Sequence, residues 1–202
     1  MPITLIILAI TCVVSFMAFK NGRLMDDLIL WPPAISRRRE YHRLVTYGLV
    51  HADFNHLLFN MITLFFFGRQ MERFYTLEMG AFGFALFYIG ALVVSILPTY
   101  FQNRDNPNYR SLGASGAVSA VLFASILLQP WSKIYLYFAL GIPAIIYAVL
   151  YITYSIYMDK RGQGNVNHSA HLWGAAYGVA FTLLVEPQVL SSFLGQLSHP
   201  RF

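Results

Sequence analysis

The stretch Gly113-Ala114-Ser115-Gly116 opens the apolar segment AVSAVLFASILL at residues 117–128, and no charged residue follows before Lys133. A second segment of this kind begins at Ala170-His171-Leu172-Trp173-Gly174. A serine and a histidine, each at the head of a hydrophobic helix, suggest a hydrolase that works inside a membrane. Such an enzyme must also admit water and hold an oxyanion.

The composition is that of a membrane protein. Of the 202 residues, 57% are hydrophobic and 11% are charged, whereas soluble domains carry about 25% charged residues. The net charge is +5, but the basic residues lie between apolar segments, which favours contact with lipid headgroups over nucleic-acid binding. The single cysteine, Cys12, excludes an internal disulfide.

Six apolar segments predict an all-α membrane protein with one domain, residues 1–202, and six transmembrane helices. The segments are approximately Ile3–Phe19, Asn55–Phe67, Met79–Pro98, Ala114–Leu128, Ile134–Met158 and Ala170–Val185. A spanning helix needs about 20 residues, so the first, third and fifth segments are long enough and the others are short. Short helices are tolerated beside a water-filled cavity, and these three carry polar residues, as a submerged active site requires.

The connections are consistent with this organisation. Lys20–Val50 is the longest and combines apolar residues with the basic run Arg37-Arg38-Arg39, which is typical of a loop in the membrane interface. Asp159–Asn167 contains Gly162 and Gly164 and is expected to be mobile. The first segment lacks a basic leader and a small-residue cleavage site, so we expect a retained helix. The sequence shows no internal repeat, which gives an inverted-repeat transporter no support.

Carboxylates are absent from the middle of every segment. All nine lie in connections or at helix ends: Asp26, Asp27, Glu40, Asp53, Glu72, Glu78, Asp105, Asp159 and Glu186. An aspartyl membrane protease needs two facing carboxylates at depth, and a zinc protease needs His-Glu-x-x-His on a helix. The sequence instead offers a dyad of Ser115 and His171, in which the histidine activates a serine that is otherwise a weak nucleophile. We expect neither a metal nor a cofactor.

Small residues would let the two helices that carry this dyad pack side by side. Gly113 and Gly116 flank Ser115, while Gly174 and Gly178 form a Gly-x-x-x-Gly pair that permits close approach of two backbones. Each feature alone also has a structural explanation, since a serine in a spanning helix commonly bonds its own backbone. A histidine within a span is rarer and indicates function.

The second segment supplies two hydrogen-bond donors. His56 and Asn60 are spaced i, i+4 and share one helix face, from which both can donate to a developing oxyanion. The alternative, that they bond a neighbouring helix, stays open for each residue alone. We expect His51 to bond loop backbone and His168 to have a structural role.

Together these motifs resemble the rhomboid family of intramembrane serine proteases over nearly the whole chain. The resemblance rests on His51 through Asn60, on Gly113-Ala114-Ser115-Gly116, and on Ala170-His171 with Gly174 and Gly178. It implies a minimal bacterial form, with six helices in a bundle around a submerged active site. By resemblance, Ser115 is the nucleophile and His171 the general base, and the oxyanion hole is formed by His56, Asn60 and the backbone N–H of Ser115.

The resemblance also implies a substrate, namely a transmembrane helix of another protein, which must unwind locally before cleavage. Arg43 matches the arginine of the family's tryptophan–arginine pair in the first loop, and Glu72-Arg73 matches its acidic–basic signature after the second helix. By analogy, the loop through Gly162 and Gly164 is expected to act as a lid. We expect the protein to be embedded in a lipid bilayer and to have no nucleic-acid partner. The sequence does not predict the oligomeric state.

The chain departs from the family pattern at two positions. His42 stands where the family has the tryptophan of its pair, so the packing of the first loop is expected to differ. Many members have an aromatic residue four positions after the nucleophile, stacked on the catalytic histidine, whereas this chain has Ser119. Another group must then orient His171, and we expect Phe123 or a hydrogen bond from Ser119 to do so.

Charge and resemblance disagree about orientation in the membrane. The Lys and Arg residues of the first, third and fifth connections outnumber those of the opposite side: Lys20, Arg23, Arg37, Arg38, Arg39, Arg43, Arg104, Arg110, Lys160 and Arg161 against Arg69, Arg73, Lys133 and Arg201. The positive-inside rule would place the odd connections in the cytoplasm. The resemblance instead opens the active site to the extracytoplasmic side of a bacterial inner membrane, and we adopt it because most of these charges lie in one interfacial loop.

Two other functions stay open at this point. A non-catalytic rhomboid-like protein would bind transmembrane clients without cleaving them, although such relatives typically lack the serine or the histidine that this chain keeps. A metal transporter would use His51, His56, His168 and His171. This chain, however, lacks the deep carboxylates and internal repeats that would support such a function.

Overall fold

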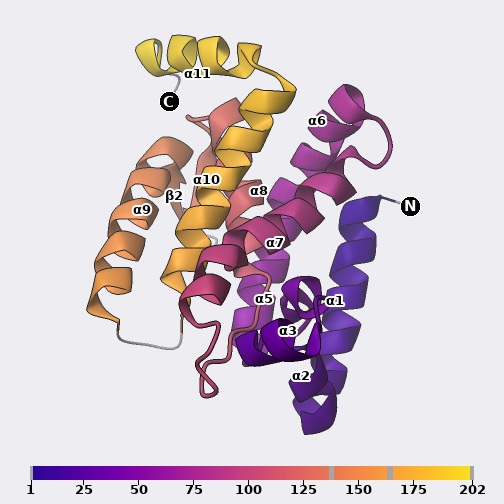
Figure 1. The fold of residues 1–202 in the computed structure, drawn as a ribbon. Helices are drawn as coiled ribbons and strands as arrows, with labels where there is room; N and C mark the ends of the chain where they lie inside the picture. Colours follow the sequence, from indigo (N-terminus) through magenta and orange to yellow (C-terminus); the bar gives the residue numbers. More distant parts are fainter. Residues whose placement is uncertain (1, 137–138, 163–165, 201–202) are drawn as a thin grey trace.

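The fold is described by a computed structural model that covers residues 2–136, 139–162 and 166–200, and it is mostly helical (Figure 1). The long helices are α1 (Ile3–Lys20), α5 (Phe54–Thr63), α6 (Arg69–Met79), α7 (Gly83–Gln102), α8 (Ser115–Leu128), α9 (Ala144–Arg161) and α10 (His168–Val185). A π-helical segment, η2 (Leu64–Gly68), joins α5 to α6. The helices form a bundle in which α8 and α10 lie side by side.

Shorter elements lie at the two ends of this bundle. Between α1 and α5 are α2 (Gly22–Leu28), α3 (Pro32–Arg38), α4 (Arg43–Thr46) and η1 (Tyr47–Leu49). At the other end, α11 (Gln188–Ser198) lies across the bundle at 114° to α10 (Figure 1). The strands β1 (Lys133–Leu136) and β2 (Leu140–Pro143) form an antiparallel hairpin between α8 and α9.

Helix α8 is the centre of the core. Every residue from Gly116 to Leu127 is buried, which is the environment expected for a helix that is apolar on all sides. Gly174 and Gly178 of α10 lie directly against α8, because a Cβ atom at either position would collide with the backbone of Gly116 or Ala120. The predicted packing of the Ser115 helix against the His171 helix is therefore present in the structure.

The second apolar segment does not end near residue 67 as predicted. The chain continues without a break from α5 through η2 into α6, so one helical run extends from Phe54 to Met79. The extension is amphipathic, since Met71 and Tyr75 are buried while polar residues occupy the opposite face. The uninterrupted apolar residues end before Gly68, whereas the helix continues to Met79.

The fifth segment, predicted as a helix over 134–158, is wrong at its start. Ile134 and Tyr135 lie in the strand β1, which pairs Lys133 with Pro143, and α9 begins only at Ala144. Pro143 has no N–H to donate to a helix that passes through it, so the helix begins after this residue. The third helix is also displaced, from the predicted 79–98 to Gly83–Gln102. It starts later because Gly80 adopts a positive φ of 82° and ends α6, and at its other end it continues past Pro98.

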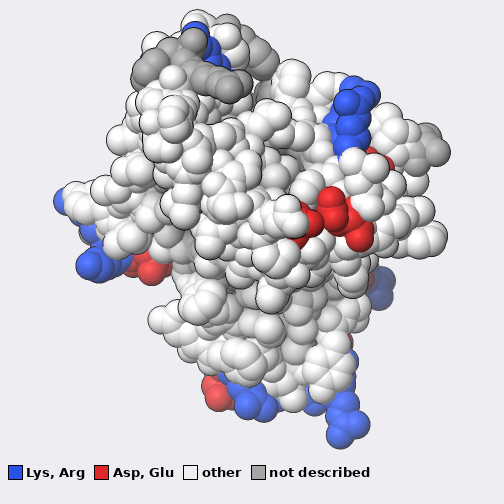
Figure 2. Space-filling view, turned by 90° about the horizontal axis from the view of Figure 1, so that it is seen from above, with Lys and Arg blue, Asp and Glu red and all other residues white. Residues whose placement is uncertain are grey.

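Among the described residues, two helices, α1 and α7, are long and apolar enough to cross a membrane, and α10 with α11 forms a bent pair that passes the same test. Helix α8 is apolar but shorter. Uncharged side chains cover most of the face that carries α11, and Lys and Arg lie toward its margins (Figure 2). The apolar helices suit a helical membrane protein, whereas the count of six spans stays a prediction.

Glu72 fixes the start of α1 from the side. Its carboxylate accepts hydrogen bonds from the backbone N–H of Ile3, from the N–H of Thr4 at 3.0 Å and from the Thr4 hydroxyl at 2.7 Å. The first N–H groups of a helix have no partner within the helix, and the positive end of its dipole favours an anion. Glu72 therefore supplies the cap that the N-cap residue, Pro2, does not provide from its own side chain.

Replacing Glu72 by alanine should lower the free energy of unfolding by about 1–2 kcal/mol, because the start of α1 loses its cap and its counter-charge. Arg73→Ala is the matched control, since Arg73 is the exposed neighbour on the same helix. Unfolding of the purified proteins in mixed detergent micelles measures both. Equal unfolding curves for Glu72→Ala and Arg73→Ala would contradict the capping role.

Candidate active site

Ser115 and His171 lie within hydrogen-bond distance of each other. Ser115 is the first residue of α8 and His171 lies in the first turn of α10. The Nε2 atom of His171 is 2.7 Å from the Oγ atom of Ser115. Both residues are half-buried. The contact between Gly174 and the backbone of Gly116 holds the two helix starts together at this point.

A glycine is required just before the serine. Gly113 has a φ of 107°, a conformation that residues with a Cβ atom rarely adopt. A Cβ atom there would also collide with the imidazole of His56. The N–H of Gly113 donates to the carbonyl of Tyr47 at 2.9 Å. The turn into α8 is thus fixed to the first loop, and the side chain of His56 lies beside it.

The start of α8 has free backbone donors. Its N-cap residue, Ala114, offers no side-chain acceptor, and the first bond of the helix runs from the N–H of Val118 to the carbonyl of Ala114 at 2.9 Å. The N–H groups of the first turn therefore have no partner within the helix. Together with the dipole of α8, they favour negative charge beside Ser115.

The two donors predicted on the second segment lie on α5 at different depths. Asp53 caps the start of α5 by accepting the N–H of His56 at 2.8 Å, and the His56 ring packs against Gly113. Asn60 is buried one turn further along, where its Nδ2 donates to the carbonyl of His56 at 2.9 Å. His56 is thus next to the Ser115 turn, while Asn60 spends one of its two amide hydrogens on its own helix.

His51 bonds loop backbone, as predicted, and its bond is to the turn that precedes Ser115. It is fully buried, with its ring centroid 4.9 Å from that of His56. The Ser15 hydroxyl donates to the Leu49 carbonyl at 2.8 Å and so accepts from Nδ1 of His51 at 3.0 Å, which leaves Nε2 to accept the N–H of Ala114 at 3.4 Å. His51 thereby links α1 to the turn that carries Ser115.

The ring of His171 is stacked on an aromatic residue from α9. Its centroid is 6.0 Å from that of Tyr151, with 25° between the ring planes. The Tyr151 hydroxyl is 2.6 Å from Ser119 Oγ, and Phe123 lies 5.6 Å from the Tyr151 ring. Both residues that were expected to orient His171 therefore contact Tyr151, which the sequence reasoning missed. The only feature of the sequence that pointed to Tyr151 was its position as an aromatic residue deep in an apolar segment, and this chain has many such residues.

Arg43 organises the first loop without the family's tryptophan at position 42. Its side chain is buried, and its guanidinium donates to the carbonyls of Asp26 at 2.6 Å and Ile29 at 2.8 Å. It also donates to the carboxylate of Glu40 at 2.6 Å, and this bond lowers the pKa of Glu40. Trp31, which lies earlier in the same loop, packs beneath the guanidinium of Arg110, whose central carbon is 4.3 Å from the ring centroid.

His168 begins α10 and is buried, with its ring 5.7 Å from that of His171. Asn167 before it caps the helix by accepting the N–H of Ala170 at 3.0 Å. No group of three or more His, Cys, Asp and Glu side chains suited to a metal ion occurs in the part of the chain that the structure describes. Within these described residues, the four histidines considered for a metal transporter are therefore not arranged as a group that could hold a metal ion.

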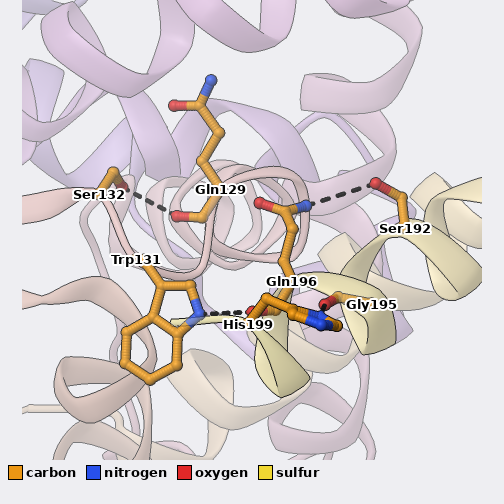
Figure 3. Close-up of a pocket in the computed structure, with 7 residues that line it drawn as sticks. All are labelled: Gln129, Trp131, Ser132, Ser192, Gly195, Gln196 and His199. Atoms are coloured by element: carbon orange, nitrogen blue, oxygen red, sulfur yellow. Dashed lines mark hydrogen bonds between the residues drawn. The ribbon is translucent and has the colours of Figure 1, made fainter. Parts of the chain in front are cut away.

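A separate pocket of about 590 Å³ lies far from these residues. Its lining joins the end of α8 to α11: Gln129, Trp131, Ser132, Ser192, Gly195, Gln196 and His199 (Figure 3). The Trp131 indole donates to the Gln196 carbonyl at 2.8 Å. Ser115 is at the opposite end of α8, about 20 Å away by helix rise, so this pocket is not part of the Ser115 site.

Comparisons with known proteins agree on one family. A family model described as "Rhomboid domain" matches residues 38–188. The chain is 32% identical over 174 residues to "RHOMBOID-like protein 12, mitochondrial" of Arabidopsis thaliana, covering 81% of the chain and 47% of that protein. It is 28% identical over 173 residues to "Putative rhomboid protease YdcA" of Bacillus subtilis (strain 168), covering 78% and 77%. It is 34% identical over 161 residues to "Rhomboid-like protein 11, chloroplastic" of Arabidopsis thaliana, covering 72% and 53%. The chain thus spans about half the length of the two plant relatives.

Proposed function

Because the chain belongs to the rhomboid family, we propose that it is an intramembrane serine endopeptidase that cleaves transmembrane segments of other membrane proteins. The observation that carries this proposal is the 2.7 Å separation of Ser115 Oγ and His171 Nε2 at the heads of two packed helices. A nucleophile and a base within hydrogen-bond reach are the minimum that acyl transfer requires.

The reaction is peptide hydrolysis through an acyl-enzyme. Ser115 Oγ attacks the carbonyl carbon of the scissile bond while its proton passes to Nε2 of His171. His171 then gives this proton to the leaving amine as the C–N bond breaks, which leaves the acyl group as an ester on Ser115. Water adds to the ester with His171 again as base, and the carboxylic acid product leaves Ser115 with its hydroxyl restored.

The oxyanion is held by groups from two helices. The N–H groups at the start of α8 have no partner within the helix, and His56 lies beside Gly113 at the same turn. Asn60 completes the set, because only one of its two amide hydrogens is bonded to the His56 carbonyl and the other is available to donate. Donors fixed in advance stabilise the tetrahedral intermediate because they need no rearrangement as charge develops.

The setting is a multi-pass membrane protein whose active site opens to the extracytoplasmic side of a bacterial inner membrane. The proposed spans are α1, the run from α5 to α6, α7, α8, α9 and α10. A substrate helix would enter beside α9 and unwind near Ser115. The proposed lid would follow α9, where Gly162 has a φ of 59°; Gly164 lies outside the described residues.

The proposal is tested by reconstituting the protein in liposomes with a model transmembrane substrate and a fluorophosphonate that labels activated serines. Wild type should cleave the substrate and take up the label, and Ser115→Ala should do neither. A chelator should leave cleavage unchanged. Substrate binding without cleavage or labelling would support the non-catalytic alternative, and equal cleavage by Ser115→Ala would end the protease proposal.

Replacing Asn60 by alanine should lower kcat about 10²-fold with little change in KM, because it removes one donor to the oxyanion. Asn103→Ala is the matched control, since both asparagines donate to the carbonyl four residues earlier, Asn103 to Thr99 at 3.0 Å. Initial rates over a substrate series give kcat and KM. If the two variants lose the same activity, Asn60 acts through its helix and not through the oxyanion.

A further inference from the structure

Tyr151 is the aromatic residue that lies against the face of the proposed general base. It comes from α9, whereas Ser115 and His171 come from α8 and α10. Its ring is nearly parallel to that of His171, at 25°, with centroids 6.0 Å apart. A ring held in this way resists rotation of the imidazole about its own side-chain bond, because rotation would press its edge into the tyrosine.

A hydrogen bond to α8 fixes the tyrosine in turn. The Tyr151 hydroxyl and Ser119 Oγ are 2.6 Å apart, and Ser119 is buried one turn after Ser115. Phe123, one turn further, packs against the same ring at 5.6 Å. The ring of Tyr151 is therefore held at its hydroxyl end by the same helix that carries the nucleophile.

His171 has little else to orient it. Among the described residues, its side chain forms a hydrogen bond with Ser115, and its other ring contact is with the edge of His168 at 5.7 Å and 74°. Serine hydrolases commonly use a carboxylate to hold the base, but no carboxylate bonds His171 among the described residues. The contact that remains to orient His171 is the stack of its ring face on Tyr151.

Resting on the proposed function, we propose that Tyr151 is a positioning residue that keeps His171 aligned with Ser115, through its ring stack and the hydrogen bond to Ser119. Tyr151 belongs to α9, which buries few of its residues. Among the described residues of this helix, only Ala144, Ala148 and Ser155 are buried. Alignment of the base consequently depends on α9 staying packed against α8 and α10.

The structure contains its own control for this role. Helices α9 and α10 run antiparallel (Figure 1), so the position three residues after Tyr151 faces the position three residues before His171. Tyr154 contacts His168 there, at 5.6 Å and 80°. This second tyrosine–histidine pair has the same residue types on the same two helices, but its histidine is not bonded to Ser115 in any described contact.

The experiment compares Tyr151→Leu with Tyr154→Leu in the liposome assay. Tyr151→Leu should lower kcat about tenfold or more with KM within about threefold, because the base loses its alignment while substrate binding is kept. Labelling of Ser115 by fluorophosphonate should slow by a similar factor. Tyr154→Leu should stay within about twofold of wild type. Equal kcat for the two variants, or a loss that appears only in KM, would overturn the proposal.

The hydrogen bond is tested separately, in variants that keep the aromatic ring. Tyr151→Phe and Ser119→Ala should each lower kcat about threefold, and the double variant should lose no more than either alone, since both remove one bond. Additive losses would overturn this part. Because wild-type cleavage that is lost in Ser115→Ala establishes the protease independently, failure of the Tyr151 variants to slow the enzyme would leave the proposed function intact.

Discussion

Ser115→Ala should lower kcat by about 10⁴-fold or more, and adding His171→Ala should lower it no further, because nucleophile and base act as one unit. A serine that has lost its base and a base that has lost its serine are equally unable to form the acyl-enzyme. The 2.7 Å contact between Oγ and Nε2 is the structural reason to expect this lack of additivity. Single-turnover cleavage of a quenched transmembrane substrate measures both variants and the double variant.

The control for this prediction is Ser125→Ala. Ser125 is a buried serine on the same helix, and its hydroxyl donates to Gln70 at 2.9 Å and not to a histidine. It should keep kcat within about threefold of wild type, since the change removes one hydrogen bond away from the site. Additive losses from Ser115→Ala and His171→Ala would show that the two residues act independently, and the dyad mechanism would then be wrong.

The parts of the site that could be predicted from the sequence lie where an apolar segment begins. Ser115 and His171 each stand at such a beginning, and the glycines beside them indicate close packing of two helices. The resemblance to the rhomboid family is confirmed by the family model and the relatives. The predicted membrane-protein character is supported by the apolar helices of the structure.

The hairpin at residues 133–143 could not be predicted from hydropathy alone. Ile134 and Tyr135 are apolar in a strand as they would be in a helix, and a short apolar run does not distinguish the two. Pro143 was a signal, because a proline removes a hydrogen bond from a helix interior, although α7 shows at Pro98 that a helix can tolerate one. The helical run from Phe54 to Met79 was predicted too short, because its second half is amphipathic and does not stand out as an apolar segment.

Tyr151 was missed because its contact with His171 depends on how α9 and α10 are aligned with each other, which the sequence alone does not specify. The pairing of Tyr151 with His171, and of Tyr154 with His168, follows only once α9 and α10 are known to be antiparallel and in contact. Ser119 was recognised as a departure from the family pattern, but its partner lies 32 residues away along the chain. Contacts of this kind are set by tertiary packing and not by local spacing.

Gly174→Val should both unfold the protein more easily and inactivate it, because one contact determines the packing of α10 on α8 and the geometry of the site. A Cβ atom at Gly174 would collide with the carbonyl of Gly116. This carbonyl belongs to the backbone of a buried helix, which is packed on all sides and cannot shift to relieve the collision. Overpacking of this kind costs about 1–3 kcal/mol or more of the free energy of unfolding. The helices must separate to relieve it, and a displacement of about 1 Å can cost 10²-fold in kcat.

Gly195→Ala and Gly174→Ala form the matched pair that isolates this contact. Both place one methyl group on a glycine within a helix, but a Cβ atom at Gly195 meets nothing within 4 Å. Gly195→Ala should leave stability unchanged or raise it by up to about 1 kcal/mol, as expected for glycine within a helix. Gly174→Ala should lower both stability and kcat, and Gly174→Val should lower them further. Unfolding in mixed micelles and liposome cleavage measure the two effects on the same preparations. If Gly174→Val kept wild-type stability and activity, the close packing of α8 on α10 would not be what brings Ser115 to His171.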